Sequence, residues 1–216
     1  LSMNSLSLNQ RLSYIGIRLA GTYIQPSEKV WIDIEETIYD ATLEVKNDSR
    51  LFMLLCSWVS VHGKHVVIEK LLNLQKKRES AWLSALAIYA VENKLHNWKS
   101  LVKKVEGEHS LSTNKIANDA IDFKGADKAF VKRGFLIAKD SIRAREKDVA
   151  SPQKLCKENL QYKNRLLIGS NWRADIITAI QMGYKNPYRI TKTIGCSYPS
   201  AFYTFKDYQI IQELVS

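Results

Sequence analysis

The chain has 216 residues, of which 45% are hydrophobic and 25% charged, with only 9 glycines and 4 prolines. These fractions exclude collagen-like, low-complexity and wholly disordered proteins, and the length fits one large domain or two small ones. The formal net charge of +10 favours an anionic partner, although a solvated lysine-rich surface explains it equally well.

The basic excess is concentrated in the C-terminal part of the sequence. Residues 1–130 contain 17 basic and 15 acidic residues, a net charge of +2, whereas residues 131–216 contain 15 and 7, a net charge of +8. A polyanion would therefore meet the C-terminal part first.

The sequence gives three indications of where the protein works. Its apolar runs are far shorter than the roughly 20 residues of a membrane span. No signal-peptide pattern opens the chain. The three cysteines lie far apart and make no disulfide framework, which favours a reducing cytoplasm.

The periodicity of apolar residues predicts a series of helices in the N-terminal part. Residues 51–59 are apolar on more than one face, and Gly63 is expected to end that helix in a left-handed conformation. Further helices are predicted over 66–74, after a capping Ser80, and over 95–105. For the segment Val30-Trp31-Ile32-Asp33-Ile34, a short strand and the start of a helix both remain open.

The tryptophans of these helices are expected on their inner faces. Trp58, Trp82 and Trp98 each recur with other apolar residues at helical spacing, which is typical of a buried core. The alternative is that one of them lines a dimer interface.

The middle of the chain is more polar. Residues 107–129 predict a loop or hinge, in which 115–123 are also compatible with a helix. The charge-rich segment 141–152 predicts a linker, with Pro152 in the first turn of the next helix.

Three short helices are predicted in the last 45 residues. The first is capped by Ser170 and closed by Gly183, and the second begins at Asn186-Pro187. Gly195 ends the second helix, and Ser197 caps a third one. The inner positions of the second and third helices are expected to be Ile190, Ile194, Ala201, Phe205 and Tyr208.

The segment NPYRITKTIGCSYPSAFYTFKDY resembles the helix-turn-helix of bacterial transcription regulators, in its tri-helical or winged-helix form. Gly195-Cys196-Ser197 corresponds to the turn, and Ala201 and Phe205 follow the serine by four and eight positions. The resemblance covers residues 170–213. The third helix offers aromatic side chains where such families commonly have Arg, Asn or Gln.

The resemblance implies that the third helix enters the major groove of duplex DNA with its N-terminal residues toward the base edges. The residues that this places at the DNA are Lys185, Arg189, Lys192, Ser197, Tyr198, Ser200, Tyr203 and Lys206. Upstream, Lys163 and Arg165 are open between contacts to the DNA backbone and a structural role, while Leu166, Leu167 and Ile168 are expected to dock on the C-terminal domain.

Candidate catalytic and metal-binding groups are isolated in the sequence. His62 and His65 are expected to be solvated turn residues, and Cys156 a half-buried helix residue. The acidic group of Asp33, Glu35, Glu36 and Asp40 is interpreted as a solvated helix face rather than a cation site. No phosphate-binding glycine loop is present. The sequence therefore predicts no enzymatic activity, no metal and no cofactor.

Together these patterns predict an all-α cytoplasmic protein. A helical domain over 1–140 would serve dimerisation or partner sensing, and residues 141–216 would form a basic linker and a helix-turn-helix domain. The expected partners are double-stranded DNA, a second copy of the chain, and an unidentified effector or protein at the N-terminal domain. The alternative is a non-catalytic helical interaction module, antitoxin-like or scaffold-like, whose C-terminal domain contacts protein.

Overall fold

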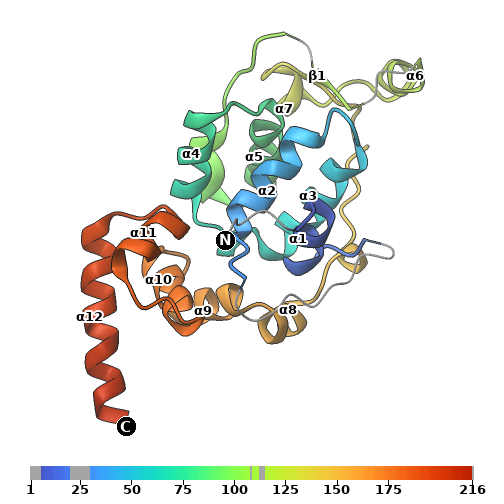
Figure 1. Ribbon diagram of the computed structural model, residues 1–216. Coiled ribbons are helices and arrows are strands. Elements are labelled where there is room, and N and C mark those ends of the chain that lie inside the picture. Colours follow the sequence, from blue (N-terminus) through green and yellow to red (C-terminus); the bar gives the residue numbers. More distant parts are fainter. Residues whose placement is uncertain (1–5, 20–29, 108, 112–114, 216) are drawn as a thin grey trace.

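The computed structural model describes residues 6–19, 30–107, 109–111 and 115–215 (Figure 1). The protein is all-α, as predicted. In the described residues the only sheet pairs β1 (His109–Ser110) with β2 (Phe135–Leu136) in parallel. No helix in this part of the chain combines the length and the apolar character that crossing a membrane requires.

The N-terminal part contains α1 (Leu8–Tyr14), α2 (Ile34–Glu44), α3 (Arg50–His62), α4 (Ile68–Lys77), α5 (Ala81–Glu92), α6 (Lys115–Lys124) and α7 (Lys128–Val131), with 3-10 turns η1 (Gly63–His65) and η2 (His96–Leu101). Eight of the twelve residues of α5 are buried. Because α5 has almost no polar face, it can pack against α2, α3, α7 and η2.

The three tryptophans expected in the core are buried there. The indole Nε1 of Trp58 donates to the carbonyl of Ile15 at 2.7 Å, and that of Trp98 donates to the carbonyl of Gly63 at 3.0 Å. Since side chains of the same chain cover them, none of the three is available to a dimer interface. That alternative is wrong.

Gly63 has a different role from the predicted one. Its φ is −59°, so it does not end α3 in a left-handed conformation. A Cβ atom at this position would instead lie 2.7 Å from Leu95 Cδ1 and 2.9 Å from Val59 Cγ1. The glycine is therefore required by close packing between α3 and the segment that precedes η2.

Other local predictions have mixed outcomes. The segment 30–34 is not a strand: α2 begins at Ile34, with Asp33 as its N-cap. Residues 95–105 form the 3-10 turn η2 and an extended segment rather than an α-helix. In the stretch 107–129, predicted as a loop or hinge, the alternative helix over 115–123 forms as α6, while residues 108 and 112–114 lie outside the described residues.

The C-terminal part continues with η3 (Glu146–Asp148), α8 (Pro152–Glu158), α9 (Leu160–Ile168), α10 (Trp172–Gln181), α11 (Pro187–Ile194) and α12 (Tyr198–Val215). Pro152 occupies the first turn of α8, as predicted. Most of residues 141–151 lie outside helices and strands.

The buried apolar side chains form two clusters. The larger one unites the N-terminal helices with Leu155 of α8 and Tyr162 of α9. The smaller one lies among α10, α11 and α12 and includes Trp31 from the segment before α2. Each cluster thus contains residues from before and after position 140. The division of the chain into domains 1–140 and 141–216 stays a prediction.

Candidate nucleic-acid interface

The three C-terminal helices begin and end close to the predicted positions. The side chain of Asn186 accepts from the backbone N–H groups of Tyr188 and Arg189, and Pro187 opens α11. Gly195 ends α11 with a φ of +76°. The hydroxyl of Ser197 accepts from the N–H of Ser200 at 3.3 Å and so caps α12. These three predictions are confirmed.

One cap lies a residue away from its predicted place. The side chain of Asn171, not Ser170, accepts from the N–H of Ala174 at 3.1 Å at the start of α10. Asparagine and serine serve equally well as N-caps, so the sequence pattern alone does not choose between neighbours.

The apolar faces of α11 and α12 pack against α10. Ile190 and Ile194 of α11 and Ala201 of α12 are buried, and Phe205 packs against the same cluster. The single methyl group of Ala201 leaves room for α12 to lie close to its neighbours. The predicted inner positions are therefore confirmed for these four residues, and their burial turns the opposite faces of both helices to solvent.

The structure places all eight residues of the predicted DNA surface at or near solvent. Ser200 is half-buried, and the other seven are exposed: Lys185, Arg189, Lys192, Ser197, Tyr198, Tyr203 and Lys206. On α11, Arg189 and Lys192 are three positions apart, on the side away from Ile190 and Ile194. The ammonium group of Lys192 lies 5.5 Å from the ring centre of Tyr188.

Aromatic side chains gather at the start of α12. The ring centres of Tyr198 and Phe202 lie 6.0 Å apart in a stacked arrangement, and those of Phe202 and Tyr203 lie 5.6 Å apart edge to face. All three side chains are exposed. Amphipathic rings at solvent are suited to contact with a partner surface, whether nucleic acid or protein.

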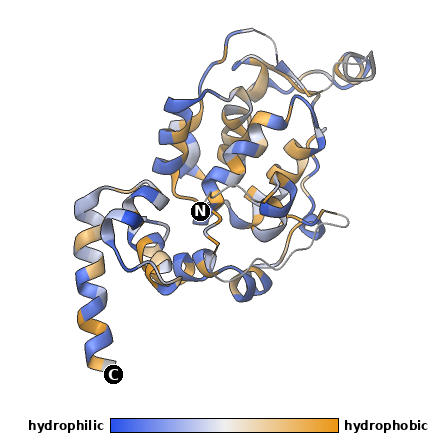
Figure 2. Cartoon of the chain, viewed as in Figure 1, coloured by the Kyte–Doolittle hydropathy of each residue, from blue (hydrophilic) through white to orange (hydrophobic). Residues whose placement is uncertain are grey.

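The C-terminal half of α12 extends beyond the other helices (Figure 1). The helix has 18 residues, and from Lys206 to Leu214 only Tyr208 is partly covered. Apolar residues recur to its end (Figure 2), among them the exposed Ile210, Ile211 and Leu214. Within the described part of the chain, Arg173 pairs with Asp207 at 3.3 Å, and the rest of this half of the helix is largely uncovered.

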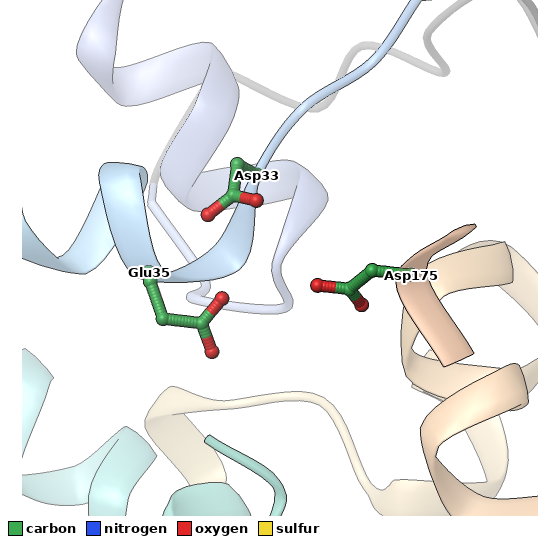
Figure 3. Close-up of side chains that lie close together, drawn as sticks. All are labelled: Asp33, Glu35 and Asp175. Atoms are coloured by element: carbon green, nitrogen blue, oxygen red, sulfur yellow. The ribbon is translucent and has the colours of Figure 1, made fainter. Parts of the chain in front are cut away.

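Five charged side chains form a buried charge cluster where α2 and α4 meet α9 and α10: Asp33, Glu35, Lys70, Arg165 and Asp175. Asp33 and Glu35 come from the start of α2 and Asp175 from α10, and their carboxylates converge (Figure 3). Lys70 belongs to α4 and Arg165 to α9. The cluster therefore connects helices from both ends of the chain.

The guanidinium group of Arg165 is fully satisfied within this cluster. It binds both oxygens of Glu35, at 2.6 and 2.7 Å, and both oxygens of Asp175, at 2.9 and 2.8 Å. Its remaining N–H donates to the carbonyl of His65 at 3.1 Å. All five N–H groups have partners, and the planar guanidinium matches the two carboxylates in a way that lysine does not.

The ammonium group of Lys70 neutralises the other side of the cluster. It donates to Asp33 and, at 2.7 Å, to Asp175. It also lies 5.7 Å from the ring centre of Trp31 and 5.4 Å from that of Trp172. Aromatic faces attract a cation most strongly where water is excluded, so the two indoles add to the ion pairs.

The pKa shifts of Asp175 and Lys70 favour the ionised cluster, whereas burial raises the pKa of Glu35 against the lowering effect of Arg165 and Lys70. Burial alone would raise the pKa of Asp175, but Arg165 and Lys70 outweigh it and lower that pKa to about 2. Burial would lower the pKa of Lys70, yet Asp33, Asp175 and Glu35 together raise it. Opposite charges within hydrogen-bonding distance favour the ionised forms at neutral pH.

The three carboxylates offer oxygens within 4.8 Å of one another, a spacing compatible with a cation. That cation is supplied by the protein, because Lys70 and Arg165 already bind these oxygens. The arrangement is thus an internal ion network that joins α9 and α10 to α2 and α4.

Neighbouring hydrogen bonds reinforce the same junction. The amide of Gln161 on α9 accepts from the N–H of Ile34 at 3.2 Å and donates to Asp175 at 3.2 Å. The indole of Trp172 donates to Glu69 on α4 at 2.7 Å.

Two predictions about these segments are wrong. Asp33 and Glu35 are buried rather than solvated, although Glu36 of the same acidic group is exposed. Of the two roles left open for Arg165, the structural one holds, because its guanidinium is enclosed by carboxylates. Leu166, Leu167 and Ile168 do not dock, since all three are exposed at the end of α9. Helical periodicity alone does not reveal that a charged residue has buried partners more than 100 residues away.

His62 is also buried, contrary to the prediction of a solvated turn. Its Nε2 lies 2.9 Å from the carbonyl of Ala150, which only accepts, so Nε2 carries the proton. Nδ1 then accepts from the hydroxyl of Tyr162 at 2.8 Å. Burial lowers the pKa of His62 to about 4 despite the bond to Ala150, so the ring is neutral at pH 7.

The three cysteines differ in burial. Cys156 is half-buried on α8, as predicted, and Cys56 and Cys196 are buried. Burial raises the pKa of the Cys56 and Cys196 thiols, which disfavours the reactive thiolate.

Comparison of the chain with protein-family models, with curated proteins and with solved structures found no match. Inference about function therefore depends on the residues and their geometry.

Proposed function

We propose that α11 and the N-terminal half of α12 bind duplex DNA, with α12 in the major groove. The observation that carries this proposal is the contrast between the two sides of these helices. Their inner sides are sealed by Ile190, Ile194 and Ala201, while their outer sides present basic, hydroxyl and aromatic side chains to solvent.

The exposed cations are suited to the phosphate backbone. Lys185, Arg189 and Lys192 lie on or just before α11, and Lys206 follows on α12. Such contacts fix the register of a protein on the duplex without reading sequence. They also supply affinity by releasing counterions.

The start of α12 would make the base contacts. The hydroxyls of Ser197 and Ser200 lie 2.8 Å apart and are engaged with each other, so we assign these contacts first to Tyr198 and Tyr203. Both rings are exposed on a helix that is narrow enough for the major groove.

The buried charge cluster supports the proposal by holding the surface in place. α10 packs against both α11 and α12, and Asp175 of α10 is bonded to Arg165 and Lys70. A recognition helix on a rigid base loses less conformational entropy on binding than one on a mobile tether.

Fluorescence anisotropy with a labelled random duplex tests the proposal. We expect saturable binding at about 50 mM salt that weakens steeply at about 200 mM. In the variant Arg189→Gln/Lys192→Gln/Lys206→Gln, affinity should fall, and the log–log salt slope should decrease by about one unit for each phosphate that is no longer bound.

A matched variant controls for the removal of three positive charges. Lys46, Lys76 and Lys104 are exposed and lie outside the C-terminal helices, so Lys46→Gln/Lys76→Gln/Lys104→Gln should bind nearly as the wild type does. An equal fall in affinity in the two triple variants would show non-specific attraction, and no binding at 50 mM would refute the proposal.

The exposed apolar side chains favour a second candidate, a helical module that binds protein through α12. Phe202, Ile210, Ile211 and Leu214 are exposed on this helix, which is unusual for residues without a partner surface. Under this alternative, the basic triple variant would keep its partner in co-purification, whereas Phe202→Ala would lose it, and neither would bind DNA.

A further inference from the structure

A cavity of about 830 Å³ lies between α5 and η2 on one side and the segment 126–139, which contains α7, on the other. This volume falls in the range of small-molecule binding sites. The cavity is separate from the C-terminal helices in the fold, since no residue of α10, α11 or α12 lines it.

The apolar residues that line the cavity are all at least partly buried, and we call them its floor. Ile88 and Val91 of α5 line it together with Val102, Ala126 and Ala129. Ile88 is buried, and the other four are partly exposed to the cavity or its mouth. An apolar floor binds the hydrocarbon part of a ligand by removing it from water.

The cations that line the same cavity are all exposed, and we call them its rim. Five cations line it, namely Lys99, Lys128, Lys132, Arg133 and Lys139, against two carboxylates, Glu92 and Asp127. Asp127 already accepts from the N–H of Ala129 as the N-cap of α7.

Among the residues that the structure describes, none of the five cations forms an ion pair. This differs from Arg11 and Arg78, which share Asp40, and from the buried cations of the charge cluster. The rim therefore keeps an excess of positive charge around an apolar floor.

We propose that this cavity binds a small organic anion, in which an apolar ring or chain carries a phosphate, sulfonate or carboxylate group. The apolar part would lie on Val91, Val102 and Ala129, and the anionic group would lie among Lys128, Lys132 and Arg133. Two of these cations carry flexible ammonium groups, and the guanidinium of Arg133 offers a planar pair of donors. The proposal goes beyond DNA binding and does not depend on it.

The dye 8-anilinonaphthalene-1-sulfonate is a suitable probe because it combines aromatic rings with one sulfonate. We expect saturable binding to the full chain, seen as enhanced and blue-shifted emission. The uncharged analogue N-phenyl-1-naphthylamine should bind more weakly. Displacement of the dye by 1-naphthyl phosphate and by 1-naphthoate then shows whether a phosphate or a carboxylate is preferred.

Two variants test the two halves of the cavity separately. Lys128→Gln/Lys132→Gln/Arg133→Gln should weaken dye binding about tenfold or more, because it removes the charge-assisted hydrogen bonds to the sulfonate. Ala129→Trp keeps every cation and fills the floor, and should weaken binding as strongly. Circular dichroism and thermal unfolding of each variant check that the fold is retained.

Two controls separate this cavity from other apolar and basic surfaces. Lys76→Gln/Lys157→Gln/Lys163→Gln removes three exposed positive charges elsewhere, and Phe202→Ser removes an exposed ring of α12. Both should bind the dye as the wild type does. Absence of saturable binding, or dye affinity that falls as far in the control variants as in the cavity variants, would overturn the proposal.

Discussion

Arg165 illustrates at the scale of one residue how a buried charge depends on its partners. Its guanidinium is the partner of two buried carboxylates, Glu35 and Asp175. A buried ion pair contributes little more to folding stability than an apolar pair of the same size. Removal of one partner, however, leaves a buried charge uncompensated and is strongly destabilising. Removal of Arg165 would therefore leave the buried carboxylates of Glu35 and Asp175 without their guanidinium partner.

We predict that Arg165→Met lowers the free energy of unfolding by about 3–5 kcal/mol. Lys163→Met changes an exposed cation on the same helix and should alter it by about 0.5 kcal/mol or less. Urea denaturation followed by circular dichroism measures both. Similar effects of the two substitutions would contradict the role assigned to the charge cluster.

His62 leads to a prediction about pH. Its pKa is about 4 in the folded protein and near 6.5 in the unfolded chain, so the unfolded state binds more protons between these values. The stabilisation is complete above pH 6.5 and is lost as the pH falls to 4, by about 3 kcal/mol in total.

The variant His62→Gln isolates this contribution. Since glutamine does not titrate, the difference in unfolding free energy between wild type and variant should shrink as the pH falls from 6.5 to 4. A difference that stays constant over this range would show that His62 is not buried in its neutral form. Asp175 does not interfere, because its lowered pKa of about 2 places its effect below pH 4.

At the scale of the element, two glycines at helix ends are required for different physical reasons. Gly195 has a φ of +76°, and a Cβ atom at this position would meet open space, so only backbone conformation selects glycine there. Gly63 has an ordinary φ, and it is the side chains of Leu95 and Val59 that exclude a Cβ there.

We expect Gly195→Ala to cost about 1 kcal/mol and Gly195→Asn about half as much, because asparagine tolerates the left-handed region. At Gly63, alanine and asparagine should both destabilise, and the larger asparagine should destabilise more. Thermal unfolding of the four variants gives the comparison, and the same rank order at both sites would contradict it.

The sequence predicts elements well where the signal is local. The caps and turns of α11 and α12 follow from Asn186, Pro187, Gly195 and Ser197, whose effects act within one helical turn. The prediction fails at Gly63 because the sequence does not distinguish a glycine selected by close packing from one selected by a positive φ. The helix predicted over 95–105 fails because the spacing of Leu95, Trp98, Leu101 and Val102 also fits a 3-10 turn followed by extended chain.

At the scale of the whole molecule, the partners of buried charges could not be predicted. Glu35 and Arg165 are 130 residues apart, and nothing in either local pattern indicates the other. The exposed positions from Lys185 to Lys206 are easier to predict, since it is enough to know which face of each helix is apolar. The sequence therefore indicates which side chains face solvent better than it indicates how the two ends of the chain are joined.

Because the charge cluster connects the two apolar clusters, we expect the protein to unfold cooperatively. Trp58, Trp82 and Trp98 report on the larger cluster and Trp31 and Trp172 on the smaller one, and the charge cluster connects the two. We expect urea unfolding curves from tryptophan fluorescence and from circular dichroism to share a midpoint. Two separated transitions would show instead that the C-terminal helices unfold independently.

The two indoles that flank Lys70 have a practical value of their own. Trp31 precedes α2 and Trp172 belongs to α10, so they approach one ammonium group from opposite sides of the junction. Indole emission is sensitive to a nearby charge. A shift of the C-terminal helices against the N-terminal ones should therefore change the intrinsic tryptophan fluorescence, without any attached dye.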